Sequence, residues 1–140
     1  LNFINMKKIL LLLSACVVLS SCAIQKYSQK TYLADYREYT ADGFTITPSS
    51  SGFTYESVGD LSIKFTIGVK DGYINKEAKW KEENVFKPSY DYMVAEIVKE
   101  AKSLGANALL NFNITPIIRG TKYGEVVDGY IASGFAVKLK

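Results

Sequence analysis

An amphipathic pattern between Pro88 and Gly105 most constrains how this 140-residue sequence can fold. Apolar residues recur there at helical spacing and form one stripe: Met93, Val94, Ile97, Val98, Ala101 and Leu104. Ser89 or Asp91 can cap the first free N–H groups of such a helix, and Gly105 suits the left-handed residue that ends it. A helix with one apolar stripe is stable only when another apolar layer covers that stripe.

Strand patterns before the helix can supply that layer. Phe44 and Ile46 alternate with threonines in a short strand that we expect Pro48 to stop. A longer extended stretch covers residues 53–69, ends at the Asp71-Gly72 turn, and carries a clean apolar alternation: Leu61, Ile63, Phe65, Ile67 and Val69. One face of that strand is therefore predicted to be buried and the other to be wet.

Two more strands are predicted after the helix. Residues 107–114 form an apolar strand that we expect to end at Pro116, and residues 125–139 form a final strand or bent strand. Gly129 and Gly134 within the last strand indicate a bulge or a close backbone approach. The order strand, strand, helix, strand, strand predicts an α+β, two-layer domain with one main helix packed on an antiparallel-rich sheet.

The N-terminal residues are typical of a secretory signal. Met6 is the expected start, two lysines follow, and the apolar run that begins at Ile9 is shorter than the roughly 20 residues of a membrane-spanning helix. Leu19-Ser20-Ser21-Cys22 resembles the lipobox of bacterial lipoproteins. That resemblance implies a signal peptide over residues 1–21, cleavage before Cys22 and acylation of its thiol.

The composition of the chain after the expected cleavage excludes several classes of function. Lys7 and Lys8 leave with the signal, so the remaining basic residues nearly balance the 14 acidic ones, and nucleic acid is not an expected partner. The sequence contains no histidine, and its two cysteines are Cys16, inside the signal, and Cys22. The commonest general base and the usual soft-metal ligands are therefore missing from the mature domain.

Residues 22–40 are predicted to be the lipidated N-terminus and a tether, and residues 41–140 the domain. The tether carries tyrosines at 27, 32, 36 and 39, and the helical spacing of the last three also allows a short amphipathic turn. Serines 49–51 have no histidine to activate them, and Glu82-Glu83 lie in a charged stretch that favours a solvated surface. The sequence therefore predicts no catalytic residue, no cofactor and no metal site.

Two segments resemble the YbjQ-type domain family. They are residues 101–110, AKSLGANALL, and residues 131–139, IASGFAVKL; residues 53–59 resemble its opening strand more weakly, and the insert at 71–88 departs from it. The resemblance implies a dodecin-like subunit that often forms ring oligomers, pentamers among them, and it carries a heavy-metal-binding label that the missing thiols and imidazoles oppose. We expect Gly105 to make the structural turn of this unit and Asn107 to bond its own backbone there.

A more distant similarity is to the outer-membrane lipoprotein that senses envelope stress for the Rcs phosphorelay. The domain of that lipoprotein is cross-linked by disulfides, which this chain cannot form. We therefore expect an envelope lipoprotein, held to the membrane by its lipid, with a non-catalytic domain for binding or homo-oligomerisation. The alternative is stress sensing or signalling through an envelope protein partner. In the lipoproteins of enteric bacteria an aspartate after the lipidated cysteine favours the inner membrane, so by that resemblance Ala23 favours the outer membrane. Ile24-Gln25-Lys26 lacks the acidic cluster that some bacteria use for surface display, so we expect the domain to face the periplasm; in a Gram-positive source it would lie outside the plasma membrane.

Overall fold

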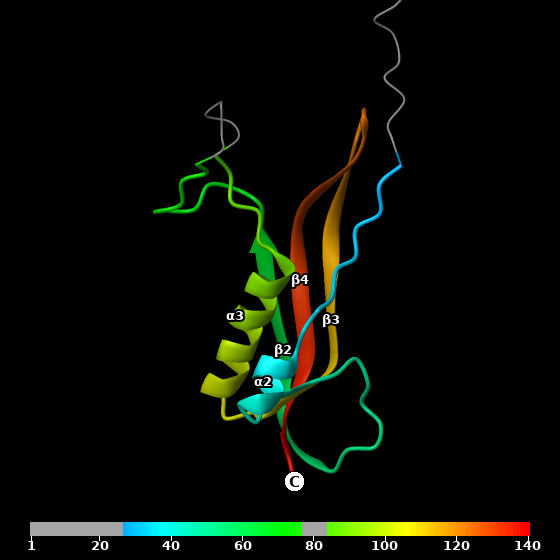
Figure 1. Cartoon of the computed structure of the whole chain (residues 1–140), viewed down its shortest axis with the longest axis vertical. Helices are drawn as coiled ribbons and strands as arrows, with labels where there is room; N and C mark the ends of the chain where they lie inside the picture. Colours follow the sequence, from blue (N-terminus) through cyan, green and yellow to red (C-terminus); the bar gives the residue numbers. More distant parts are fainter. Residues whose placement is uncertain (1–26, 77–83) are drawn as a thin grey trace, which may run out of the picture. The chain divides into compact units, whose positions relative to one another are not determined.

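The computed structural model describes residues 27–76 and 84–140. The chain divides into two units, Leu1–Tyr32 and Leu33–Lys140, and every element below belongs to the second. In chain order the elements are α2 (Arg37–Ala41), β1 (Thr45–Ile46), β2 (Tyr55–Thr66), α3 (Tyr90–Ser103), β3 (Ala108–Thr121) and β4 (Gly124–Leu139) (Figure 1). None of the helices in these described ranges is long and apolar enough to cross a bilayer.

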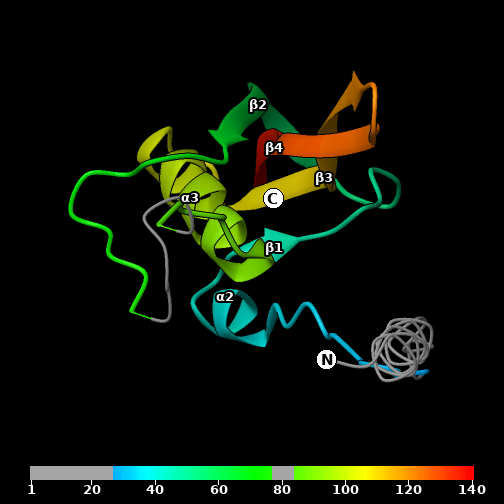
Figure 2. The same ribbon diagram turned by 90° about the horizontal axis from the view of Figure 1, so that it is seen from above.

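The four strands form one mixed sheet in the order β1-β3-β4-β2. The long pairings of β4 with β3 and with β2 are antiparallel, and the short β1 runs parallel to β3. The helix α3 lies against one face of this sheet (Figure 2). The α+β class and the single main helix on a largely antiparallel sheet agree with the sequence prediction.

The main core lies between α3 and the sheet. It joins the stripe of α3 to the inner residues of the strands, and its completely or almost completely buried members are Phe44, Ile97, Ala101, Leu109, Ala132 and Ala136. Leu104 was predicted to extend the stripe, and that prediction is wrong because the side chain is 51% exposed. The helix ends at Ser103, so Leu104 lies beyond the last turn that faces the sheet.

Both ends of α3 are made by local hydrogen bonds. The Ser89 hydroxyl oxygen accepts a hydrogen bond from the N–H of Tyr92 at 3.1 Å, so Ser89 is the N-cap and Asp91 lies in the first turn. At the other end Gly105 has φ +82°, and its N–H donates to the carbonyl of Lys102. Glycine adopts this left-handed conformation without the steric cost that other residues pay.

β3 is longer than the sequence predicts. Pro116 was expected to end it, but the strand continues to Thr121, and Pro116 pairs with Tyr130 of β4. The opposite side of β3 is covered by β1 only at Ala108 and Leu109. On that side, no described strand lies beside Pro116. A proline lacks an N–H donor, which is tolerated at an edge that has no partner to receive it.

Gly129 and Gly134 stand where backbones approach closely. A Cβ at Gly129 would lie inside the 3.0 Å limit of real contacts to the Phe65 carbonyl oxygen, and one at Gly134 would lie 3.2 Å from a methyl group of Leu109. β3 also bulges opposite Gly134, where two residues, Asn111 and Phe112, face one. The sequence prediction of a bulge or a close approach at these two glycines is therefore confirmed.

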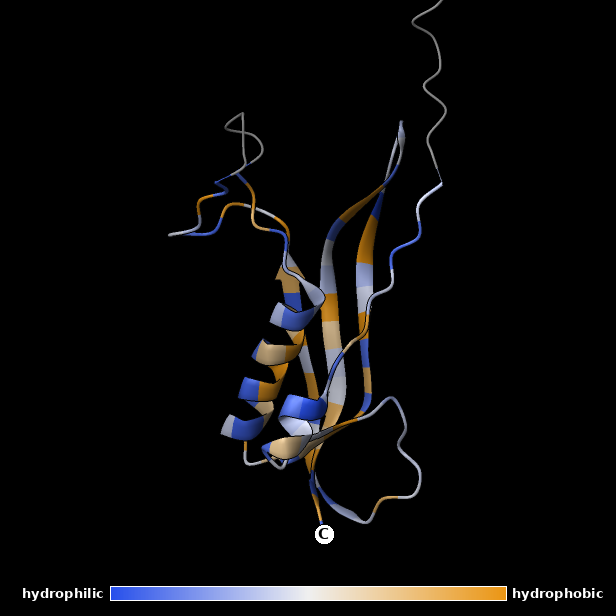
Figure 3. Ribbon diagram, viewed as in Figure 1, coloured by the Kyte–Doolittle hydropathy of each residue, from blue (hydrophilic) through white to orange (hydrophobic). Residues whose placement is uncertain are grey.

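The apolar alternation predicted for residues 61–69 holds for its first half. Leu61, Ile63 and Phe65 are half-buried on the side of β2 that packs against the core, and hydrophobic and hydrophilic residues alternate along the strands (Figure 3). Val69, in contrast, is 86% exposed. β2 ends at Thr66, so the chain has left the sheet and no apolar layer covers Val69.

The domain begins earlier than the sequence predicts. Residues 33–40 were assigned to the tether, but they belong to the compact unit that starts at Leu33. Tyr36 and Tyr39 pack against the core, the Tyr36 ring meets Phe112 edge-to-face at 6.3 Å, and its hydroxyl is 2.7 Å from that of Tyr90. The predicted helical turn is present for two of the three tyrosines, because Tyr36 is the N-cap of α2 and Tyr39 lies within it, whereas Tyr32 lies before the helix.

Candidate functional site

Of the residues singled out in the sequence, some lie outside the described part of the chain, and others, Gly105 and Asn107, lie within it. Cys22, the whole signal segment and Glu82-Glu83 lie outside the described residues. Asn107 lies at the start of β3, where its side-chain oxygen accepts a hydrogen bond from the N–H of Leu139 at 2.7 Å. The prediction that Asn107 bonds its own backbone is therefore wrong, because its partner is the end of β4.

Asn107 joins three strands at one end of the sheet. Its backbone N–H donates to the carbonyl of Val137 at 3.0 Å, and its carbonyl accepts from the N–H of Thr45 at 3.0 Å. Together with the side-chain bond to Leu139, these contacts hold the beginning of β1, the beginning of β3 and the end of β4 together. Gly105 and Asn107 thus have a structural role and lie apart from any groove described below.

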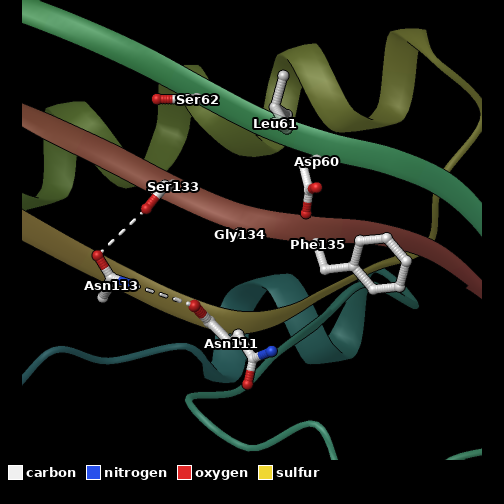
Figure 4. Close-up of a pocket in the computed structure, with 8 residues that line it drawn as sticks. All are labelled: Asp60, Leu61, Ser62, Asn111, Asn113, Ser133, Gly134 and Phe135. Atoms are coloured by element: carbon white, nitrogen blue, oxygen red, sulfur yellow. Dashed lines mark hydrogen bonds between the residues drawn. The ribbon is translucent and has the colours of Figure 1, made fainter.

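A concave site with a largely polar lining lies on the sheet face opposite α3 (Figure 4). It is a shallow groove of about 320 Å³ that crosses β2, β4 and β3. Its lining residues are Asp60, Leu61, Ser62, Asn111, Asn113, Ser133, Gly134 and Phe135. We refer to it as the open-face groove.

Strand register brings these residues together. Ser133 of β4 pairs with Ser62 on one side and with Asn113 on the other, so three short polar side chains form one row across the sheet. Next to this row, the bulge places Asn111 at φ +50°, a left-handed conformation that asparagine tolerates better than most residues. The groove therefore depends on both the register and the bulge.

Hydrogen bonds order one side of the groove. The Ser133 hydroxyl donates to the side-chain oxygen of Asn113 at 3.2 Å, and the Asn113 amide donates to the backbone carbonyl of Asn111 at 3.3 Å. An amide oxygen is not a base, so this contact does not activate Ser133 as a nucleophile. Asp60 on β2 contributes a carboxylate and Phe135 on β4 an aromatic ring, so the groove offers both polar contacts and an apolar surface to a bound group (Figure 4).

The sequence carries little signal for this groove. Its residues come from positions 60–62, 111, 113 and 133–135, and the strand alternation predicts only that Ser62 lies on the wet face. The register of β3 against β4 depends on the bulge at Asn111, and nothing in the local sequence specifies it. Gly134, which the sequence did mark, lines the groove because its missing side chain lets β3 approach.

A second concave site of about 270 Å³ lies where the 71–88 insert meets β2 and α3. Two lysines, Lys64 and Lys70, line it, and the Lys70 ammonium lies 4.4 Å from the Phe86 ring centre and 4.7 Å from that of Tyr92. The same ammonium donates to the Tyr92 hydroxyl at 2.9 Å. Lys70 therefore fills this aromatic site itself, and the contact attaches the described end of the insert to the helix.

An ion pair between Arg119 and Asp128 links β3 to β4 in the hairpin that these strands form. Arg119 donates to both carboxylate oxygens of Asp128, at 2.7 and 3.1 Å. These hydrogen bonds lower the pKa of Asp128 and raise that of Arg119. Across residues 27–76 and 84–140, no group of three or more potential metal ligands comes together.

Comparison with known proteins adds no family to this geometry. The chain matches no protein-family model, and no curated protein is significantly similar to it. The α+β class and the open-face groove therefore rest on the structure alone.

Proposed function

We propose that this chain is a lipid-anchored protein of the bacterial cell envelope whose domain is a non-catalytic module for binding and homo-oligomerisation. The lipid is carried by Cys22, and the domain faces the periplasm from the outer membrane. The basic, apolar and lipobox segments in the printed sequence support the anchor. In the structure, the observation that carries the proposal is the free edge of β2.

β2 is an edge strand of twelve residues, and its outer side has no partner strand among the described residues. Such an edge presents a row of free N–H and C=O groups, which readily pair with another strand. The apolar side chains on its inner face, Leu61, Ile63 and Phe65, are only half-buried. Pairing at this edge would satisfy the backbone groups and cover the rest of those side chains.

The finer fold assignment belongs to the same proposal. A dodecin- or YbjQ-like subunit accounts for the unit in which α3 ends at Gly105 and β3 follows at once. Members of that family assemble through such subunits, which agrees with an exposed edge. The mature chain provides neither thiol nor imidazole for the heavy-metal label, so we propose assembly and not metal binding.

Light scattering on residues 23–140 tests the assembly. We expect a closed oligomer at micromolar concentration, with a mass that is a whole multiple of that of the chain. A monomer at high micromolar concentration would contradict the oligomerisation part of the proposal.

Metabolic labelling with palmitate tests the anchor. We expect the parent chain and a Cys16→Ala variant to incorporate the label, because Cys16 is removed with the signal. A Cys22→Ala variant should incorporate none. Label that persists in Cys22→Ala would show that the lipid assignment is wrong.

Stress sensing or signalling through an envelope protein is the second candidate. The tip of the β3–β4 hairpin favours it, since four apolar side chains are well exposed there: Ile118, Tyr123, Val126 and Val127. If this candidate is right, the domain is a monomer, and a Val126→Asp/Val127→Asp variant loses a cross-linked envelope partner that the parent chain retains. Retention of the partner by that variant would argue against the hairpin tip.

A further inference from the structure

The free edge of β2 has a sequence that fits a second copy of itself. In an antiparallel pair, directly opposed residues either both point their N–H and C=O groups toward the partner or both point them away. These orientations alternate along the strand, so an even-numbered residue can oppose only an even-numbered residue of the second copy, and an odd-numbered one only an odd-numbered one. The sum of two opposed residue numbers is then always even. The twofold axis therefore passes between one residue and the same residue of the second copy.

Charge selects one of the allowed registers. After the irregularity between Ser57 and Gly59, β2 carries two charged residues, Asp60 and Lys64, both exposed and on the open face. An axis at Asp60 or at Lys64 would set like charges directly opposite each other, which is destabilising. An axis at Ser62 sets each Asp60 opposite Lys64 of the second copy, so two ion pairs form.

The inner face of β2 fits the same register. An axis at Ser62 sets Leu61 opposite Ile63 of the second copy, which pairs two half-buried apolar side chains. It also sets Phe65 opposite Gly59, where no atom lies within 4 Å of the position a Cβ would take. An aromatic ring beside a strand glycine is a stabilising cross-strand arrangement.

The other edge of the sheet does not match β2. β1 has two residues against the twelve of β2, and the uncovered part of β3 contains Pro116, which has no N–H to donate. Head-to-tail pairing of β2 with this edge would therefore meet a missing donor at Pro116, part way along β3. Pairing of β2 with itself matches the two edges in length.

We propose that two copies of this chain pair along β2 about a twofold axis at Ser62 and join their sheets into one continuous sheet. This inference rests on the proposed oligomerisation and specifies its contact. Asp60 and Ser62 line the open-face groove, so each copy places Lys64 beside the groove of the other. The pair of grooves then lies across the axis, with a cation from the second copy at the edge of each.

Cysteine cross-linking tests the register. Ser62→Cys places two thiols directly opposite each other, at a Cα separation of about 4.5–5.5 Å, which a disulfide can span. Ser133→Cys is the matched control, because it lies in the same row, but two such residues would be separated by three strand spacings, about 14 Å. The parent chain measures any background from Cys16 and Cys22, the only other cysteines of the printed sequence.

The full chain is extracted from membranes in mild detergent and treated with a mild oxidant. We expect a covalent dimer for Ser62→Cys, visible on a non-reducing gel, and none above the parent background for Ser133→Cys. Absence of the Ser62 dimer, or equal dimer from both variants, overturns the register.

Charge exchange gives an independent test. Asp60→Lys or Lys64→Asp alone should weaken dimerisation by on the order of tenfold in Kd, because each turns two attractive pairs into repulsive ones. The double exchange should restore parent affinity, and Lys99→Asp on the outer side of α3 should change nothing.

The two proposals fail in different ways. If the chain is oligomeric but ignores both the charge changes and the Ser62 thiol, the β2 contact is wrong and oligomerisation stands. If every variant and the parent are monomeric, both proposals are wrong.

Discussion

Replacing Gly129 by alanine is the sharpest test of the strand packing. The added Cβ would meet the Phe65 carbonyl oxygen inside the 3.0 Å limit, and would also lie 3.2 Å from the Phe65 carbonyl carbon and from the Cα of Thr66. These are backbone atoms of a paired strand, so no side chain can rotate away. β2 and β4 must separate locally by roughly an ångström. Overpacking of this kind typically lowers the free energy of unfolding by about 1–3 kcal/mol.

That separation also weakens the hydrogen bonds where Thr66 pairs with Gly129. Each lost bond costs about 1 kcal/mol, so we expect a total loss of about 2–4 kcal/mol in unfolding free energy and a fall in Tm of roughly 10–20 °C. Denaturant unfolding followed by circular dichroism measures the loss, and an unchanged m-value shows that the unfolded state is unaffected.

Gly120→Ala is the matched control, because Gly120 lies in β3 of the same hairpin and nothing lies within 4 Å of the added Cβ. We expect a change of less than about 1 kcal/mol, with a slight stabilisation because alanine restricts the unfolded chain. If the two variants unfold within about 0.5 kcal/mol of each other, the close approach of β2 to Gly129 is not present in solution.

Two further predictions follow from side-chain hydrogen bonds. Ser89→Ala removes the N-cap of α3 and should cost about 1 kcal/mol by denaturant unfolding, while Ser50→Ala in the exposed loop should cost almost nothing; equal effects would argue against the cap. The pKa of Asp128 is lowered by its bonds to Arg119, so its contribution to stability is present above the unfolded pKa of about 3.9 and is lost as pH falls through the lower folded value. Carboxyl-carbon NMR titration should show that low pKa rising toward its usual range in Arg119→Ala, and an unchanged titration would contradict the pair.

The elements that the sequence predicts well are those decided by neighbours along the chain. The stripe of α3, a cap at Ser89 or Asp91 and the left-handed Gly105 all follow from spacing within a few residues, and the structure chooses Ser89 as the cap. Pro116 was misread because its effect depends on whether a strand lies beside it, which is a property of the whole sheet. Leu104 and Val69 were misread for a similar reason, since each continues a pattern past the point where its element ends.

The open-face groove could not be predicted from the sequence for a related reason. The row formed by Ser62, Ser133 and Asn113 exists only when three strands take one register, and that register includes a bulge at Asn111. A shift of one residue would turn every side chain of a strand to the other face. The same holds for the start of the domain, where Tyr36 reads as a polar tether residue until Phe112 and Tyr90 are placed beside it.

The sequence by itself determined the α+β class, the main helix and the absence of cysteine and histidine from residues 23–140, because these depend on composition and on local periodicity. It also indicated a bulge or a close backbone approach at Gly129 and Gly134, since a strand interior otherwise disfavours glycine. Only the tertiary structure decided which atoms approach these glycines, which edge of the described sheet has no partner strand and which polar residues share a groove. Those features depend on contacts between residues far apart in the chain, and such contacts are specified by the packing of the whole domain.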